Sequence, residues 1–126
     1  MSGGDIGKAG EDAAARYLRK NGCKILERNF STPLGEIDII ALDGEVVCFV
    51  EVRSRSSADF GSAVEKLPRR KQRQVTKAAL AYLKTKHLED ADIRFDYAAV
   101  VIPREGKSQV DLIRDAFQPR ESMRGR

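Results

Sequence analysis

The chain contains one histidine, His87, and two cysteines, Cys23 and Cys48, which lie far apart in the sequence. No CxxC metal-binding pattern and no Cys–His pairing is present, which argues against the zinc sites and thiol nucleophiles that depend on them. Each cysteine sits in an apolar stretch, as is typical of small buried residues in a reducing compartment. We therefore expect both cysteines to be buried and reduced.

Long hydrophobic runs are also missing. No apolar stretch approaches the ~20 residues that a membrane-spanning helix needs. The first residues, Met1–Gly4, lack the apolar segment of a signal peptide. We therefore expect a cytoplasmic protein with no membrane partner.

The composition indicates one folded domain. Hydrophobic residues make up 41% of the 126 residues and charged residues 33%, which is enough apolar content for a core and too much for disorder. A chain of this length has little room for a second core. We expect a single domain over residues 1–117, followed by a basic, disordered tail over residues 118–126.

Hydrophobic spacing predicts the order α-β-β-β-α-β-β. Helical periodicity covers residues 6–20 and 68–86, and Pro68 takes the first-turn position that proline favours. Strand-like segments lie at residues 23–30, 36–42, 45–53, 93–102 and 109–113. The second and third of these are apolar on both faces, so we expect an α/β fold whose sheet is covered on both sides.

Three carboxylates fall on two strands that a tight turn joins. A two-residue turn at Asp43-Gly44 would place Glu36 opposite Glu51. Asp38 points the same way as Glu36, because strand residues two apart share a face. Like charges this close are unfavourable unless something compensates them, and Asp38 and Glu51 also interrupt apolar runs.

A bound divalent cation is the simplest compensation. Oxygen ligands suit Mg²⁺ and Mn²⁺, which bind through one or two carboxylates together with water and phosphate oxygens. The predicted metal ligands are Asp38, Glu51 and Glu36. Two alternatives remain: Arg53 neutralises Glu51 in a plain surface ion pair, or a register shift separates the acids.

Basic residues are concentrated after Glu65, where no acid interrupts them up to residue 77. They are Lys66, Arg69, Arg70, Lys71, Arg73 and Lys77. Such a run is either a solvated helix face or a phosphate-binding surface. Tryptophan is absent and aromatic residues are few, so Phe60, in the preceding loop, is the best candidate for a contact with a base.

Several of these segments resemble the bacterial family UPF0102. The resemblance rests first on Gly35-Glu36-Ile37-Asp38 and on Phe49-Val50-Glu51-Val52-Arg53-Ser54-Arg55. Other matching segments, in the expected order, are Gly10-Glu11-Asp12-Ala13-Ala14, Phe60-Gly61-Ser62 and Arg70-Lys71-Gln72-Arg73. Together they span the chain from Gly7 to about Phe117.

That family is similar to archaeal Holliday junction resolvases and to the PD-(D/E)xK nucleases. The resemblance implies a restriction-endonuclease-like three-layer fold, with a mixed central β-sheet flanked by helices. It also implies that Asp38 and Glu51 are the catalytic acids and that Glu11 is the acid of the first helix. The homodimer that we expect rests on the resolvase resemblance alone.

Position 53 departs from the pattern of those nucleases, which usually have lysine there. Arginine effectively cannot lose its proton, so Arg53 can stabilise charge but cannot take part in proton transfer as lysine can. Lys66 is a candidate substitute from the following loop. Gln72 either reaches the site or hydrogen-bonds the sheet.

The predicted function is a Mg²⁺- or Mn²⁺-dependent endonuclease that hydrolyses phosphodiester bonds in DNA, with branched or structured DNA as the candidate substrate. The predicted nucleic-acid contacts, without a base-reading motif, are Arg55, Arg69, Arg70, Lys71, Arg73 and Phe60. Two alternatives stay open. One is a nucleic-acid-binding protein that keeps the fold but cuts poorly, and the other is an interaction protein whose charges are solvated surface.

Overall fold

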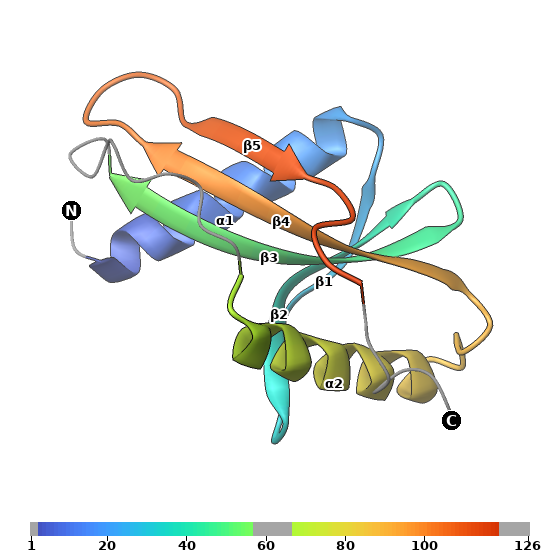
Figure 1. Cartoon of the computed structure of the whole chain (residues 1–126). Helices are drawn as coiled ribbons and strands as arrows, with labels where there is room; N and C mark the ends of the chain where they lie inside the picture. The colour runs from blue at the N-terminus through green and yellow to red at the C-terminus, as the bar shows by residue number, and fades with distance from the viewer. Residues whose placement is uncertain (1–2, 57–66, 119–126) are drawn as a thin grey trace.

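The computed structural model describes residues 3–56 and 67–118, and its elements follow the predicted order (Figure 1). The helices are α1 (Gly3–Lys20) and α2 (Arg69–Thr85). The strands are β1 (Lys24–Thr32), β2 (Gly35–Asp43), β3 (Val46–Ser56), β4 (Asp92–Ile102) and β5 (Gln109–Ile113). Phe60, Lys66 and all of the predicted tail after Gln118 lie outside the described residues.

In the described part of the chain, five strands form one mixed sheet in the order β1-β2-β3-β4-β5. β3 and β4 run parallel, as the crossover through α2 requires, and the other neighbouring pairs are antiparallel. Helix α1 covers one face of the sheet and α2 covers the other (Figure 1). The predicted three-layer α/β fold with a mixed sheet is confirmed.

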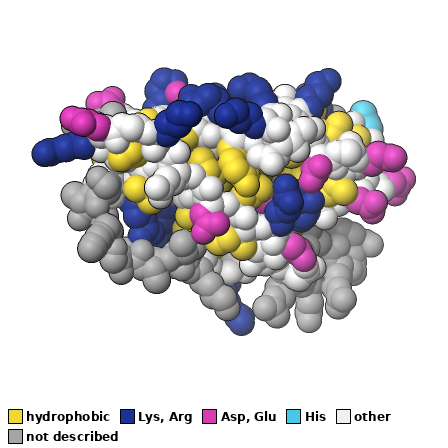
Figure 2. All heavy atoms as spheres, turned by 90° about the horizontal axis from the view of Figure 1, so that it is seen from above, with side chains coloured by type: hydrophobic (Ala, Val, Ile, Leu, Met, Phe, Trp, Pro, Cys, Tyr) yellow, Lys and Arg dark blue, Asp and Glu magenta, His cyan; other side chains and the backbone are white. Residues whose placement is uncertain are grey.

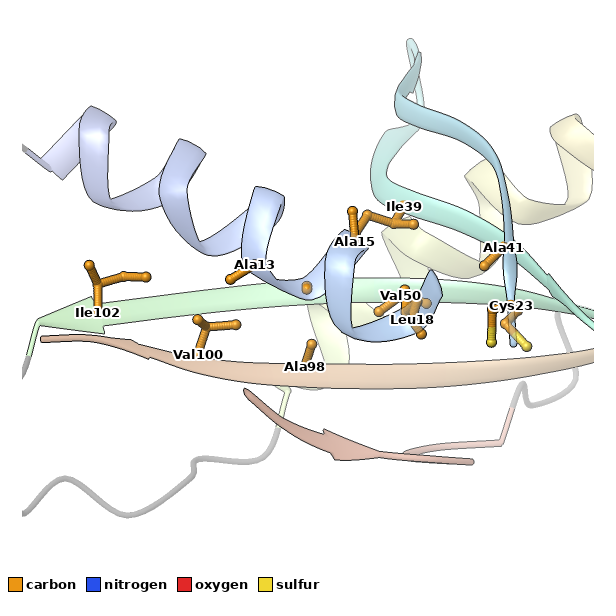
Figure 3. Packing of buried hydrophobic residues seen from close by; sticks show 12 residues of the cluster. Ala13, Ala15, Leu18, Cys23, Ile39, Ala41, Val50, Ala98, Val100 and Ile102 are labelled. Atoms are coloured by element: carbon orange, nitrogen blue, oxygen red, sulfur yellow. The ribbon is translucent and has the colours of Figure 1, made fainter. Parts of the chain in front are cut away.

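Helix α1 lies close to the sheet because most of the side chains that face it are small. Ala13 and Leu18 belong to the buried cluster that also contains Val50 of β3 (Figure 3). Gly10 makes a still closer approach, since a Cβ at this position would overlap the hydroxyl group of Ser54 in β3. This contact fixes α1 against the end of β3 that carries the candidate site.

The opposite face of the sheet carries larger side chains. The Tyr82 ring of α2 packs edge-on against Phe30 and Phe49, with ring centroids 5.2 and 6.1 Å away. Phe95 lies 5.5 Å from Phe49 across β3 and β4. Aromatic contacts of this geometry hold α2 in one orientation on the sheet.

The β2–β3 turn differs from the prediction. Gly44 and Glu45 form the turn, and Leu42 pairs with Val47 instead of Glu45, a shift of two residues. Gly44 is the first residue of the observed turn, and its φ of 63° is a left-handed conformation that glycine adopts without strain. The shift moves Asp38, in place of the predicted Glu36, toward Glu51.

Strands β2 and β3 stop pairing with each other at the end of their hairpin that lies away from the turn. The β2–β3 pairing extends to Ile39 and Val50, whereas β2 stays paired with β1 as far as Gly35. β3 stays paired with β4 as far as Ser56. In Figure 1 the tip of the β1–β2 hairpin projects past α2, while β3 and β4 continue in another direction. We call the point where β2 and β3 separate, just beyond the paired residues Ile39 and Val50, the fork.

None of the helices in residues 3–56 and 67–118 has the length and apolar character needed to span a membrane.

Candidate acidic site at the fork

Asp38 and Glu51 are the first residues beyond the paired part of β2 and β3. The Val52 N–H donates to Asp38 Oδ2 at 2.8 Å, and the Asp38 N–H donates to Glu51 Oε2 at 3.4 Å. Ile37 and Ile40 both pack toward α2, although strand residues three apart would face opposite sides, so β2 is irregular at Asp38. The backbones of the two strands therefore hold the two acids close together. We call them the acidic pair.

Both carboxyl groups sit in surroundings that disfavour their charge. Glu51 is 3% exposed, and burial, followed by repulsion from Asp38, raises the pKa of Glu51 to about 8. Burial also raises the pKa of Asp38, and the carboxylates of Glu11 and Glu36 add to that shift. A bound cation would relieve this arrangement, because it favours the charged form of both carboxyl groups, whose pKa values are raised.

Lys71, near the start of α2, contacts the acidic pair directly. Its Nζ lies 3.4 Å from Glu51 Oε1, and its charge opposes the rise in the pKa of both acids. The ion pair does not cancel the effect of burial, because the pKa of Glu51 stays at about 8 with Lys71 beside it.

We did not predict from the sequence that Lys71 contacts Glu51 and assigned Lys71 to the nucleic-acid contacts instead. The spacing of residues in α2 does, however, indicate this contact. Lys71 precedes Val75 by four residues and Ala78 by seven, so it continues the buried stripe of α2. A lysine at the first position of a buried stripe indicates a charged partner on the neighbouring sheet.

A cavity of about 490 Å³ borders the acidic pair on the α2 side. Its lining includes Asp38, Glu51 and Lys71, together with Arg53 and Arg70. The two acids and three basic side chains thus line one space. An anion bound there would lie near the acidic pair and near several positive charges.

Asp38 also borders a second cavity, of about 510 Å³, on the α1 side. Glu11 and Arg55 line it with Asp38. Glu11 forms an ion pair with Arg28 at 2.6 Å and accepts a hydrogen bond from Asn29 at 3.2 Å. The acid of the first helix therefore shares a cavity with Asp38, while its own charge is balanced by Arg28.

Glu36 does not lie opposite Glu51 as predicted. It is exposed and accepts a hydrogen bond from Ser31 at 3.3 Å. Within the described ranges, no group of three or more His, Cys, Asp and Glu side chains is arranged to hold a metal ion. The predicted pairing of Glu36 with Glu51 is wrong because the turn lies one residue later, at Gly44 and Glu45.

The comparison with known proteins places these residues in a family. The model described as "Uncharacterised protein family UPF0102" matches residues 10–100. The chain belongs to the UPF0102 family. A UPF0102 protein of Pelotomaculum thermopropionicum is 46% identical to it over 113 residues, which cover 89% of this chain and 94% of the relative.

Two further UPF0102 relatives are similar over most of their length. The protein of Desulfosudis oleivorans is 47% identical over 88% of each chain. The protein of Dictyoglomus thermophilum is 43% identical over 85% of this chain and 91% of its own. The region that the family model matches contains the fork, the acidic pair and Lys71.

The remaining predicted site residues of this UPF0102 protein surround the acidic pair less directly. Arg53 is exposed at the edge of the α2-side cavity, and Arg69 and Arg73 are exposed on α2. Gln72 does not line that cavity. Its amide donates to the Leu67 carbonyl at 2.7 Å, which secures the start of α2.

Basic side chains also gather on the face away from α2. Figure 2, which looks down on that face, shows Lys and Arg side chains in a row along one edge. A cavity of about 530 Å³ between α1 and the β4–β5 connection is lined by Arg16, Lys20 and Lys107, among others. In the described part of the chain, basic side chains therefore gather at this second place as well as on α2.

The donor atoms at the fork suit a hard divalent cation. Asp38 and Glu51 offer carboxylate oxygens, and Mg²⁺ commonly takes one or two carboxylates and completes its shell with water and phosphate. The two cysteines, Cys23 and Cys48, are buried in the α1-side core, as expected, so soft ligands do not come from them. The residues of the fork therefore fit Mg²⁺ or Mn²⁺ better than zinc.

Proposed function

We propose that this UPF0102 protein is a divalent-cation-dependent nuclease that hydrolyses phosphodiester bonds in DNA. The observation that carries the proposal is the acidic pair: Asp38 and Glu51 meet at the fork and share a cavity with Lys71. Phosphodiester hydrolysis needs a cation, a water and positive charge around one phosphate, and this cavity brings the matching side chains together. The resemblance of the family to resolvases supports the same reaction.

Asp38 and Glu51 would hold the cation, Mg²⁺ or Mn²⁺, through their carboxylate oxygens. When bound, the ion supplies a lowered pKa for a coordinated water and a positive charge at the phosphoryl oxygens. Burial and Asp38 keep the pKa of Glu51 at about 8, so binding is expected to release a proton near neutral pH.

Lysine and arginine side chains around the cavity would contribute to the reaction in different ways. Lys71, 3.4 Å from Glu51, orients that carboxylate and places an ammonium group where negative charge develops on the phosphate. Arg53 and Arg70 offer guanidinium groups, which bind phosphate oxygens in pairs. Because Lys71 supplies an ammonium group at the site, arginine at position 53 does not exclude hydrolysis.

The surface around the cavity favours recognition of DNA shape over DNA sequence. Arg69 and Arg73 are exposed on α2, and Arg55 lines the α1-side cavity. Contacts of this kind bind phosphates and carry no sequence information. We therefore expect structure-selective or non-specific cleavage. Branched DNA is the candidate substrate, and the resolvase resemblance makes a homodimer the expected active form.

Two measurements on the full chain test the proposal. Calorimetric titration with Mn²⁺ should give a binding heat that Asp38→Asn and Glu51→Gln each greatly reduce. Labelled four-way-junction and linear DNA should be cut in Mn²⁺ by the wild type, and about 100-fold more slowly by E51Q. Glu89→Gln, which removes an exposed carboxylate after α2, is the control and should change neither result. Equal cutting by the wild type and E51Q would place any hydrolysis elsewhere.

A DNA-binding protein without hydrolysis is the second candidate. Two observations favour it: the fork brings together two carboxylates of the described residues rather than three, and Arg53 stands where resembling nucleases usually have lysine. In that case the wild type and E51Q would bind DNA with the same salt dependence, and neither would cut it.

A further inference from the structure

The tip of the β1–β2 hairpin, Thr32–Gly35, presents an exposed leucine beside the fork. Leu34 is 58% exposed, and among the described residues no other large hydrophobic side chain is exposed to this degree. Pro33 before it is exposed as well. Tight hairpin tips commonly carry Gly, Asn or Asp, so a Pro-Leu tip leaves unusual apolar surface in water.

The tip is held rigidly. Thr32 Oγ1 accepts hydrogen bonds from the N–H groups of Leu34 and Gly35, at 3.0 and 3.1 Å. Pro33 fixes its own φ. Gly35 rests on α2, because a Cβ at this position would lie 2.6 Å from the Gln74 carbonyl oxygen. These contacts hold the backbone of the tip in one conformation, and in Figure 1 the hairpin tip projects past α2.

Positive side chains of α2 flank the tip. Arg70 and Lys77 lie about one helical turn on either side of Gln74, which contacts Gly35, and both are exposed. Glu36 is exposed directly after the tip and would repel a phosphate there. This distribution fits a ligand that places an uncharged apolar group at the tip and its phosphates along α2.

The tip also lies at a defined distance from the acidic pair along β2. Asp38 follows Leu34 by four residues, which is roughly 13 Å along a strand. Successive phosphates of one DNA strand advance about 3.4 Å along the duplex axis. Leu34 and the acidic pair are thus separated by about four nucleotide steps.

We propose that Pro33 and Leu34 form an apolar wedge that packs against bases at a DNA branch point, with the phosphate about four nucleotides away at the acidic pair. Apolar side chains, Leu and Pro among them, enter base steps in proteins that kink DNA, at a cost in lost stacking. That cost is smallest where bases are already unpaired. The inference rests on the proposed function for DNA as the ligand, and it adds the element that selects branched DNA.

Binding without cleavage tests the wedge. Fluorescence anisotropy in EDTA compares a four-way junction with linear duplex for the wild type, Leu34→Ala and Leu34→Met. L34A should lose about tenfold in affinity for the junction and less than about twofold for linear duplex, whereas L34M should keep the junction preference. Arg70→Ala should weaken binding to both DNAs alike. A 2-aminopurine base at the branch point should brighten with the wild type and not with L34A.

Several results of these experiments would reject the wedge. Equal junction binding by the wild type and L34A, no fluorescence rise with the wild type, or no binding of either DNA would each reject it. A lower molecular mass of L34A in sedimentation equilibrium would also reject it and make the tip a contact between copies of this chain. If the wild type gives no Mn²⁺ binding heat but still prefers the junction over linear duplex, the proposed nuclease is rejected and the wedge is retained.

Discussion

The Lys71 ammonium group lies 3.4 Å from one carboxylate oxygen of Glu51, in a cavity that both residues line. The other oxygen of Glu51 accepts the Asp38 N–H of β2. Glu51 therefore ties the start of α2 to the fork. A cation at the fork would compete with Lys71 for the same carboxylate, so the two charges can be tested separately.

Lys71→Met keeps the apolar stem of the side chain and removes its charge. Mn²⁺ should bind a few-fold more tightly, because a positive charge beside one ligand is lost. The cleavage rate should fall by about 100-fold, because stabilisation of the phosphate in the transition state is lost as well. Calorimetry and single-turnover cleavage measure the two effects.

Lys84→Met, on the exposed C-terminal end of α2, is the matched control and should change neither quantity. Weaker Mn²⁺ binding by K71M together with an unchanged cleavage rate would show that Lys71 only supports the structure of the fork.

Glu51 should make the folded protein less stable as the pH rises. The pKa of Glu51 is about 8 in the folded chain, against 4.5 for an unperturbed glutamate. Between these values the folded state keeps a proton that the unfolded state has lost. The free energy of unfolding therefore falls with rising pH, by up to about 1.4 kcal/mol per pH unit. The raised pKa of Asp38 adds an effect of the same sign.

Urea unfolding in EDTA across this pH range measures the effect. Glu51→Gln should remove most of the slope and should be more stable than the wild type at pH 9, since it buries no charge. Added Mn²⁺ should restore stability at high pH in the wild type only. A wild-type free energy of unfolding that stays constant or rises from pH 5 to pH 8 would show that the pKa of Glu51 is not raised in the folded protein.

Gly10 and Gly7 form a matched pair in α1. A Cβ at Gly10 would overlap the Ser54 side chain, whereas nothing lies within 4 Å of a Cβ at Gly7. Gly10→Ala should destabilise the protein by about 1–3 kcal/mol through overpacking. Gly7→Ala should stabilise it by about 0.5–1 kcal/mol, because alanine loses less conformational freedom in a helix. Similar thermal midpoints for both variants would contradict the close approach of α1 to β3.

The fold could be predicted from the sequence because most of its elements carry strong local signals. The apolar stripe of α1 and the apolar runs of β2 and β3 specify a sheet covered on both faces. The turn could not be placed, because Asp43-Gly44 and Gly44-Glu45 are both acceptable two-residue turns. The choice between them is made by side-chain packing across the whole hairpin.

The acidic pair was predictable for a different reason. Asp38 and Glu51 interrupt apolar strands, and a charge in such a place needs compensation. The fork itself has no local signature, since the point where two strands stop pairing depends on contacts with β1, β4 and α2. Glu36 was therefore assigned to the cluster, and the contact of Lys71 with Glu51 was missed.

We propose that Asp38 and Glu51 together bind one divalent cation, and anomalous diffraction from a Mn²⁺-soaked crystal is the decisive experiment. We expect one manganese peak within coordination distance of an oxygen atom from each carboxylate, and no such peak in crystals of Asp38→Asn. A wild-type crystal with no manganese at the fork, or with the ion held by other residues, would contradict the claim.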